Sequence, residues 1–290
     1  MTAECRNAHP DRTINLVAWE ELEEKLKELR KDRGPHSSGL LFRGQGNSCW
    51  PLSTTLERVT VKREMSFQDY YESIYRAKPA IESYTEKTWD IPDPHEVGSL
   101  TARVEPFASF TAEHYKTWGR VYSYMVYLRH HGFPSPFLDW TLSPYIAAFF
   151  AFRSPIEGVK KVSIYAYREM LDSRKNPKIC SSADPTIYNL PEQYVRTHRR
   201  HFLQQCEYTI CAENNGREWL FSSHEDVFAR GDANTDVLQK FNIPVTERLK
   251  VLKLLDEYNL NAFSLFGSEE SLMETMALRE LAGCLSGSSS

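Results

Sequence analysis

The sequence lacks the features that mark several large classes of protein. No apolar run approaches the roughly 20 residues that a membrane-spanning helix needs, and the longest candidate, residues 145–152, is far too short. The first 13 residues hold no apolar signal-peptide segment, so we expect a cytoplasmic protein with no membrane partner. Neither a G-x-G-x-x-G fingerprint after a strand nor a G-x-x-x-x-G-K-[ST] loop is present, which excludes the common dinucleotide fingerprint and the P-loop.

Cysteines are few and scattered, and basic residues do not dominate. The six cysteines form no C-x-x-C pair and no Cys/His cluster at zinc spacing, so we expect neither a disulfide framework nor a bound metal. Lys and Arg number 35 against 39 Asp and Glu, which gives a formal net charge of −4. A basic coat over the whole chain is therefore excluded, whereas a local basic patch for nucleic acid is not.

The composition is that of an ordinary globular protein. Of the 290 residues, 41% are hydrophobic and 26% are charged. Because no linker or repeat interrupts the chain, we expect one domain over residues 14–275, between a disordered N-terminus (1–13) and a C-terminal tail (276–290). Predicted helices and strands alternate irregularly, which favours an α+β fold.

Hydrophobic periodicity predicts the main elements. We expect helices at residues 16–29, 66–84, 118–131 and around 249–255, and strands at 40–42, 162–167 and 207–212. Prolines indicate a loop at residues 90–98 and an extended segment at 133–141. Ser143 and Pro144 then suit the cap and first position of a further, apolar helix.

The first candidate for a site is Phe42-Arg43-Gly44-Gln45, at the end of a buried strand. An arginine in that position needs a partner, and its planar guanidinium fits a carboxylate or a phosphate. Gly44 and Gly46 would let a ligand approach the backbone closely. A structural pair between Arg43 and a carboxylate explains the arginine equally simply.

The second candidate is Asp139-Trp140-Thr141-x-Ser143, where a strand leads into a helix. The free N–H groups at a helix N-terminus attract anions, and hydroxyl groups beside them add hydrogen bonds. Capping by Ser143 accounts for that residue alone. It leaves Asp139 and Thr141 unexplained.

The third candidate combines Gln205 and Glu207 with the basic run before them. Residues two apart share one face of a strand, and a carboxylate there could stabilise an oxocarbenium-like centre. The alternative is a solvated strand edge. Upstream, Arg196, Arg199 and Arg200 could hold a phosphate backbone or simply form a solvated helix face.

Together these residues resemble the FRG-domain family, named for a Phe-Arg-Gly triplet. The resemblance begins with the helix around Trp19 and rests on the segments 42–45, 50–52 with Arg58, 131–141 with the apolar helix behind them, 204–205, 243–244 and 264–266. It extends over roughly residues 14–270. The order of the motifs is similar to that of ADP-ribosyltransferases of the Arg–Ser–Glu class, which implies a mixed sheet core surrounded by helices.

The resemblance implies NAD as the substrate and assigns residues to it. An Arg-Gly strand would hold the phosphates and ribose, and a Ser/Thr strand with its helix would form the nicotinamide pocket, where a triplet Asp139-Trp140-Thr141 replaces the usual Ser-Thr-Ser. The implied NAD-binding residues are Arg43, Gly44, Gln45, Asp139, Trp140, Thr141, Ser143 and Tyr145. The implied catalytic residues are Glu207, Gln205 and Arg43.

The expected activity is transfer of ADP-ribose from NAD to a macromolecule. The basic residues Arg196, Arg199 and Arg200 favour an RNA acceptor. The resemblance further implies a bacterial toxin of a toxin–antitoxin or anti-phage system, with a neutralising antitoxin protein as partner. Three alternatives stay open: transfer to a protein, hydrolysis of NAD, and a non-catalytic module in which Arg43 and Asp139 form a buried pair.

Overall fold

A single mixed sheet organises the chain in the computed structural model, which describes residues 12–31, 37–60, 65–107, 112–170, 184–190, 199–229 and 236–285. Its strands are β1 (Thr13–Asn15), β2 (Ser37–Gln45), β3 (Phe137–Thr141), β4 (Lys161–Met170), β5 (Thr186–Leu190), β6 (Cys206–Asn214), β7 (Trp219–Phe221) and β8 (Val237–Pro244). They lie in the order β1-β8-β4-β2-β3-β6-β5, with β7 also paired to β6. β1 and β8 are parallel and the other pairs are antiparallel.

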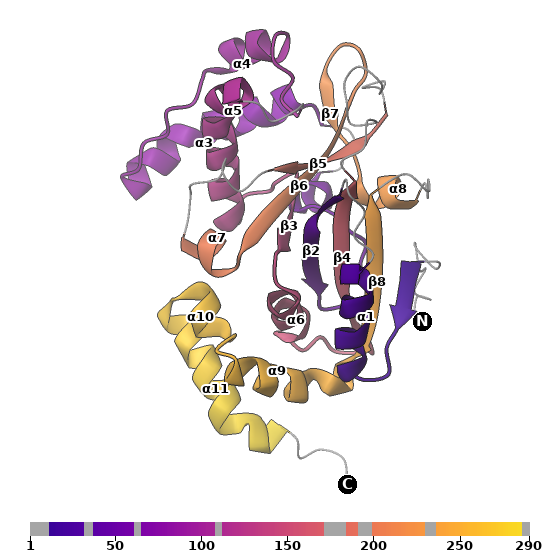
Figure 1. Ribbon diagram of the computed structural model, residues 1–290. Coiled ribbons are helices and arrows are strands. Elements are labelled where there is room, and N and C mark those ends of the chain that lie inside the picture. Colours follow the sequence, from indigo (N-terminus) through magenta and orange to yellow (C-terminus); the bar gives the residue numbers. More distant parts are fainter. Residues whose placement is uncertain are drawn as a thin grey trace.

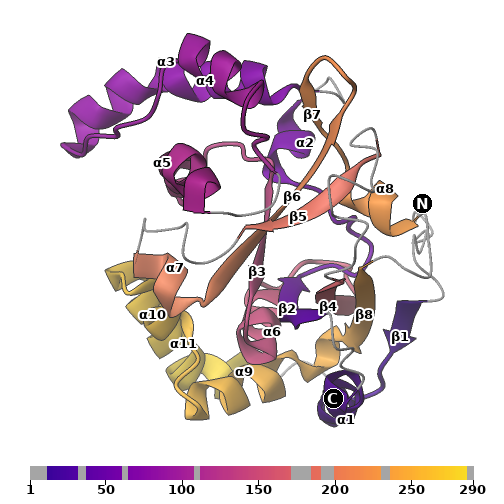
Figure 2. The same ribbon diagram turned by 45° about the horizontal axis from the view of Figure 1, so that its top comes forward.

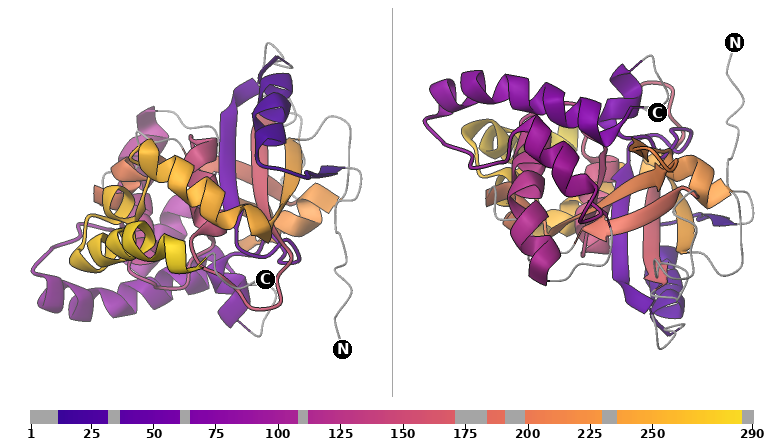
Figure 3. Two further views of the ribbon diagram at one scale, coloured as in Figure 1. Left: turned by 90° about the horizontal axis from the view of Figure 1, so that it is seen from below. Right: turned by 90° about the horizontal axis from the view of Figure 1, so that it is seen from above.

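Helices cover the sheet in two groups. They are α1 (Glu20–Lys31), α2 (Thr55–Val59), α3 (Phe67–Thr85), α4 (Pro94–Thr101), α5 (Ala112–His130), α6 (Pro144–Phe152), α7 (Arg199–Leu203), α8 (His224–Ala229), α9 (Arg248–Glu257), α10 (Ala262–Phe266) and α11 (Glu269–Leu285). Helices α3–α5 lie at one end of the molecule, and α9–α11 lie at the other with α6 and α1 (Figures 1 and 2). Figure 3 shows these two ends face on. None of the described helices is long and apolar enough to cross a membrane.

The expected α+β class is confirmed, and the main predicted elements are present. The predicted helices correspond to α1, α3, α5, α6 and α9, and the predicted strands to β2, β4 and β6. The cap of α6 is as expected: the Ser143 side chain accepts a hydrogen bond from the Ile146 N–H, and Pro144 occupies the first turn.

Three expectations differ from the structure. Residues 94–101 form α4 rather than a loop, because Pro94 lies in the first turn, where its missing N–H costs nothing, and Asp93 caps the helix. Cys49 is disulfide-bonded, which sequence spacing could not show because a disulfide requires closeness in the fold. The expected start of the tail, residue 276, falls inside α11.

Apolar side chains fill both faces of the sheet. On one face, α1, α6 and α9 bury their side chains against Phe42, Ile164 and Phe241 of the central strands. On the other face a smaller cluster contains Trp140 and Tyr165. A third, aromatic cluster joins α3 and α5 to β6 and β7. Packing in these three clusters fixes the positions of the strands between them.

The sheet is weakly joined between β2 and β3. Seven registered pairs join β2 to β4, and five join β3 to β6. Between β2 and β3, both of which are fully described, the register contains the single pair Phe42–Thr141. The side chains that follow Phe42 on β2 and those that precede Thr141 on β3 therefore face an opening rather than a continuous sheet.

Gly44 allows α6 to pack directly against the backbone of β2. A Cβ atom at this position would lie 1.9 Å from the Ala147 carbonyl oxygen and 2.7 Å from the Ala151 nitrogen. Both neighbours are helix backbone and cannot move aside cheaply. The expectation that Gly44 makes room for a ligand needs correction, since this glycine is required by the helix behind the strand.

We therefore expect Gly44→Ala to lower the free energy of unfolding by about 3 kcal/mol or more, because overpacking against backbone forces strand and helix apart. Denaturant unfolding measures this loss. Gly39→Ala is the matched control on the same strand, where an added Cβ meets nothing within 4 Å, and it should change stability by no more than ~0.5 kcal/mol. Equal stabilities of the two variants would contradict the close packing of α6.

Candidate functional site

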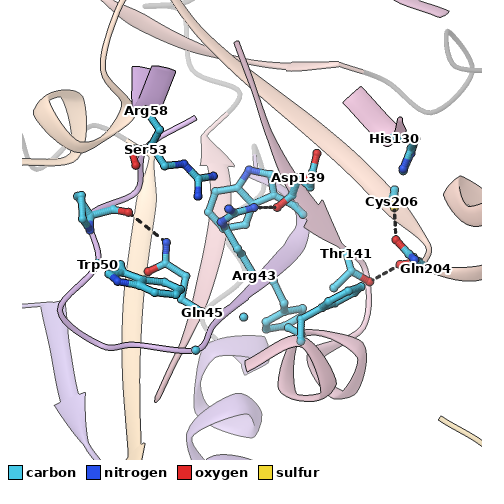
Figure 4. Close-up of a pocket in the computed structure, with 17 residues that line it drawn as sticks. Arg43, Gln45, Trp50, Ser53, Arg58, His130, Asp139, Thr141, Gln204 and Cys206 are labelled. Carbon is cyan, nitrogen blue, oxygen red and sulfur yellow. Dashed lines mark hydrogen bonds between the residues drawn. The ribbon is translucent and has the colours of Figure 1, made fainter. Parts of the chain in front are cut away.

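A pocket of about 670 Å³ lies at the opening between β2 and β3. Its volume is within the range of small-molecule sites, about 300–1,000 Å³. Strands β2 and β3, the segment after β2, helix α6 and the start of β6 form its walls (Figure 4). The residues that line it include Arg43, Gly44, Gln45, Trp50, Arg58, His130, Asp139, Trp140, Thr141, Phe150, Gln204 and Cys206.

Arg43 points into this pocket and has no carboxylate partner among the described residues. Its Nη1 donates a hydrogen bond to the backbone oxygen of Asp139 at 2.7 Å, and its buried Nε has no partner in the part of the chain that the structure describes. The Asp139 carboxylate instead binds Arg129, with Nη2–Oδ2 at 2.5 Å and Nε–Oδ1 at 3.2 Å. The alternative of a buried Arg43–Asp139 ion pair is therefore wrong.

Arg58 places a second guanidinium group in the same pocket. Its Nε donates to the Thr54 carbonyl oxygen at 3.2 Å. Burial, together with the positive charges of Arg129 and Arg58, lowers the pKa of Arg43 to about 10, which still leaves it charged at neutral pH. Among the residues that the structure describes, neither Arg43 nor Arg58 forms a salt bridge. The pocket therefore carries positive charge that the protein does not neutralise.

Hydrogen bonds fix the polar groups at the base of the pocket. Thr141 Oγ1 donates to the Gln204 carbonyl oxygen at 2.8 Å and accepts from the Ser143 N–H at 3.2 Å. Gln45 donates from Nε2 to the Pro51 oxygen at 3.1 Å, while its buried Oε1 has no partner among the described residues. Thr141 thus ties the start of α6 to the segment before β6, and Gln45 leaves one acceptor for a ligand.

Two predicted NAD-binding residues lie outside the residues that line the pocket. Ser143 is occupied in capping α6. The Tyr145 hydroxyl donates to Glu23 of α1, and this hydrogen bond, with burial, raises the pKa of Tyr145 to about 12. Neither residue is therefore available to NAD in the way that the resemblance implied.

We had expected Gln205 and Glu207 to share one face of a strand at the site. Instead, neither residue lines the pocket. Gln205 is exposed and lies in the turn before β6, with a left-handed φ of 48°. Glu207 is buried and lies opposite Trp140 in the register. Their neighbours Gln204 and Cys206 line the pocket instead, and the Cys206 thiol donates to Gln204 Oε1 at 3.7 Å. The alternation is therefore kept, but the other set of alternate residues faces the pocket.

The basic run lies partly beside the pocket. Arg196 is outside the described residues. Arg199 is exposed on α7, and Arg200 lies over the Phe266 ring at 5.4 Å from its centroid. Phe266 in turn contacts Phe150, which lines the pocket, with ring centroids 5.9 Å apart. The Phe266 ring thus lies between Arg200 and Phe150 of the pocket wall.

Sequence reasoning missed several pocket residues, among them Arg58, Trp50 and His130. Arg58 and Trp50 follow the Phe-Arg-Gly segment, which was their only signal. Trp50 is 47% exposed, unusual for a large ring, and this exposure cannot be read from the sequence. His130 ends α5 and reaches the pocket only through the packing of that helix.

A hydrogen-bonded chain supports the pocket wall from behind. Trp140 Nε1 donates to Thr209 Oγ1 at 2.8 Å, and this hydroxyl is hydrogen-bonded to His224 Nε2 at 3.0 Å. Burial, with the positive charge of Arg43 as a smaller cause, lowers the pKa of His224 to about 3. His224 is therefore neutral in the folded protein, and its Nε2 shares one hydrogen bond with the Thr209 hydroxyl.

His224 should make stability depend on pH. Its pKa is lower in the folded protein than the usual value near 6.5, so the stability it contributes is present above pH 6.5 and is lost as the pH falls toward 3. In His224→Gln, the free energy of unfolding should fall less steeply in this window, by up to about 1.4 kcal/mol per pH unit. Urea unfolding at a series of pH values measures the slope.

The matched control is His95→Gln, at an exposed position in α4. It should keep the slope of the unsubstituted protein. An unchanged slope in His224→Gln would show that His224 is not held neutral by burial.

Comparison with known proteins supplies a family for the central part of the chain. The FRG domain matches residues 38–159, which include β2, α2–α6 and β3 and thus the segments that carry Arg43, Arg58 and Asp139. No curated protein and no solved structure matches the chain.

Proposed function

This chain contains an FRG domain, and we propose that its pocket binds NAD and transfers the ADP-ribose part to a macromolecular acceptor. The observation that carries the proposal is the pair Arg43 and Arg58, two guanidinium groups in one pocket without a carboxylate partner among the described residues. Unpaired charge is costly to remove from water. A diphosphate offsets that cost with charge-assisted, bidentate hydrogen bonds.

The remaining pocket residues suit the other parts of a dinucleotide. Trp50 and Phe150 line the pocket and offer aromatic surface for a nucleobase or a nicotinamide ring. The unpaired Oε1 of Gln45 can accept a hydrogen bond from a ribose hydroxyl. The volume of about 670 Å³ is also adequate.

Transfer requires stabilisation of positive charge at the ribose. The bond between C1′ and the nicotinamide nitrogen breaks, its electron pair leaves with nicotinamide, and an acceptor atom bonds to C1′ and gives up its proton. A carboxylate near C1′ stabilises this centre. Asp139 is the acidic residue among those that line the pocket, so we assign it this role, with Arg129 holding it in position.

Release of free nicotinamide from NAD, measured with and without RNA, tests the activity. Release that requires RNA is the expected result. Release without any acceptor would identify a hydrolase, and release only with added protein would identify a protein-directed transferase. No release under any condition would identify a non-catalytic binding module and contradict the proposal.

The two carboxylates can be compared directly. Asp139→Asn removes the charge at the pocket while keeping the size, and turnover should fall on the order of 10²–10³-fold with little change in NAD affinity. Glu207→Gln is the matched variant of the carboxylate that does not line the pocket. It should retain activity if the protein folds. The reverse outcome would return the catalytic role to Glu207.

RNA is the acceptor that the surroundings of the pocket favour. Arg199 is exposed, and Arg200 lies beside the ring that contacts Phe150. An unstacked RNA base can enter a pocket that a duplex cannot. Because modified RNA is lost to the cell, we also propose that the chain acts as a toxin and that a neutralising protein is its partner.

Replacing both arginines should reveal whether they bind phosphates. In Arg199→Ala/Arg200→Ala, the slope of log affinity for single-stranded RNA against log salt should become shallower by about 0.7 for each phosphate that the protein no longer neutralises, while NAD binding is kept. Fluorescence anisotropy at several salt concentrations gives the slope. Arg76→Ala/Arg217→Ala removes two other exposed arginines as a control. Equal slopes for the two double variants would eliminate α7 as the part of the protein that binds RNA.

A further inference from the structure

A cluster of two imidazoles, a thiol and a phenol lies in the wall of the pocket. His130 comes from the end of α5, His201 from α7, and Cys206 and Tyr208 from the start of β6. The Tyr208 hydroxyl is hydrogen-bonded to His130 Nε2 at 2.7 Å and to His201 Nδ1 at 3.1 Å. One ligand atom from each of His130, His201 and Cys206 lies within 4.8 Å of the other two.

The fold holds these side chains together firmly. Tyr208 is fully buried, and the His201 ring stacks on it with centroids 5.7 Å apart and an interplanar angle of 15°. The His130 ring meets Tyr208 edge to face at 82°. The left-handed turn at Gln205 brings α7 back against β6, which places His201 over a strand that follows it closely in sequence. The three ligand atoms are therefore gathered before any ion arrives.

We propose that His130, His201 and Cys206 form a binding site for one divalent cation of the zinc class. Two imidazole nitrogens and one sulfur are the donors that zinc prefers, whereas magnesium and calcium require oxygen donors. Zinc–nitrogen bonds of about 2.0 Å and zinc–sulfur bonds of about 2.3 Å place tetrahedral ligands less than about 4 Å apart. The three ligand atoms now lie within 4.8 Å of one another, and small rotations of the side chains bring them to this shorter distance.

Binding displaces protons in a definite way. The Cys206 S–H bond breaks, the sulfur bonds to the metal, and the proton goes to solvent. The Tyr208 hydroxyl has one proton and can donate it to one histidine only, so the other histidine donates its own ring proton to the phenol oxygen. On binding, that histidine moves the proton to its other ring nitrogen, and both hydrogen bonds to the phenol are given up.

The fourth coordination position would face the pocket, since His130 and Cys206 both line it (Figure 4). Three protein ligands with one open position is the arrangement of catalytic zinc sites, whereas structural sites use four. The ligand at that position is water or an oxygen or nitrogen atom of the bound molecule. The site does not depend on the proposed function, because the ion binds whether or not the pocket accepts NAD.

Cobalt(II) is a direct probe of this site. The full-length protein is dialysed against a chelator and titrated with Co²⁺, followed by Zn²⁺ as competitor. One equivalent should bind with visible bands of tetrahedral cobalt and a near-ultraviolet band from thiolate to cobalt, and zinc should abolish both. Absence of a one-to-one spectroscopic endpoint would overturn the proposal.

Variants assign the ligands. Cys206→Ser should lose the thiolate band, and His201→Gln should weaken Co²⁺ binding more than ~100-fold, beyond the usual effect of residues that merely support a ligand. His130→Gln gives the same test if His201→Gln does not fold, which circular dichroism reports. Cys211→Ser is the control, because Cys211 is also a buried thiol of β6 outside any disulfide and lies on the other face. A thiolate band that persists in Cys206→Ser or disappears in Cys211→Ser would contradict the assignment.

Discussion

The close contact between α6 and the backbone of β2 at Gly44 is the constraint on which the pocket depends. Because a Cβ atom cannot fit there, helix and strand lie at the shortest separation that the backbone allows. Helix α6 follows directly from β3, so this contact also fixes where β3 can lie. The two strands then meet at the single pair Phe42–Thr141, and Arg43 extends into the opening beside it.

The local parts of this arrangement could be predicted from the sequence. The cap at Ser143, the strand that carries Arg43 and the strand before α6 depend on neighbours in the chain, so their signals are complete within a short segment. The set of alternate side chains at the start of β6 that faces the pocket could not be predicted, because either set has the same spacing and the turn at Gln205, a non-glycine residue with a left-handed φ, has no sequence signal. A non-glycine residue in that region is uncommon, and the pattern of alternation gives no warning of it.

The pocket residues that reach the site through the packing of separate elements could not be predicted from the sequence either. Arg58 and His130 come from helices whose apolar faces predict burial but not which end reaches a pocket. The ion pair between Arg129 and Asp139 belongs to the same class, since it joins α5 to β3. This pair engages the carboxylate that the sequence offered to Arg43, and it is the reason that Arg43 has no carboxylate partner among the described residues.

The central claim is that this charge binds the diphosphate of NAD. A crystal structure of the protein with ADP-ribose tests it most directly, because ADP-ribose retains the diphosphate and cannot be cleaved at the nicotinamide bond. Our account predicts phosphate oxygens within hydrogen-bonding distance of Arg43 Nε and of the Arg58 guanidinium group. A structure in which ADP-ribose binds elsewhere, or binds here without contacting either arginine, would contradict it.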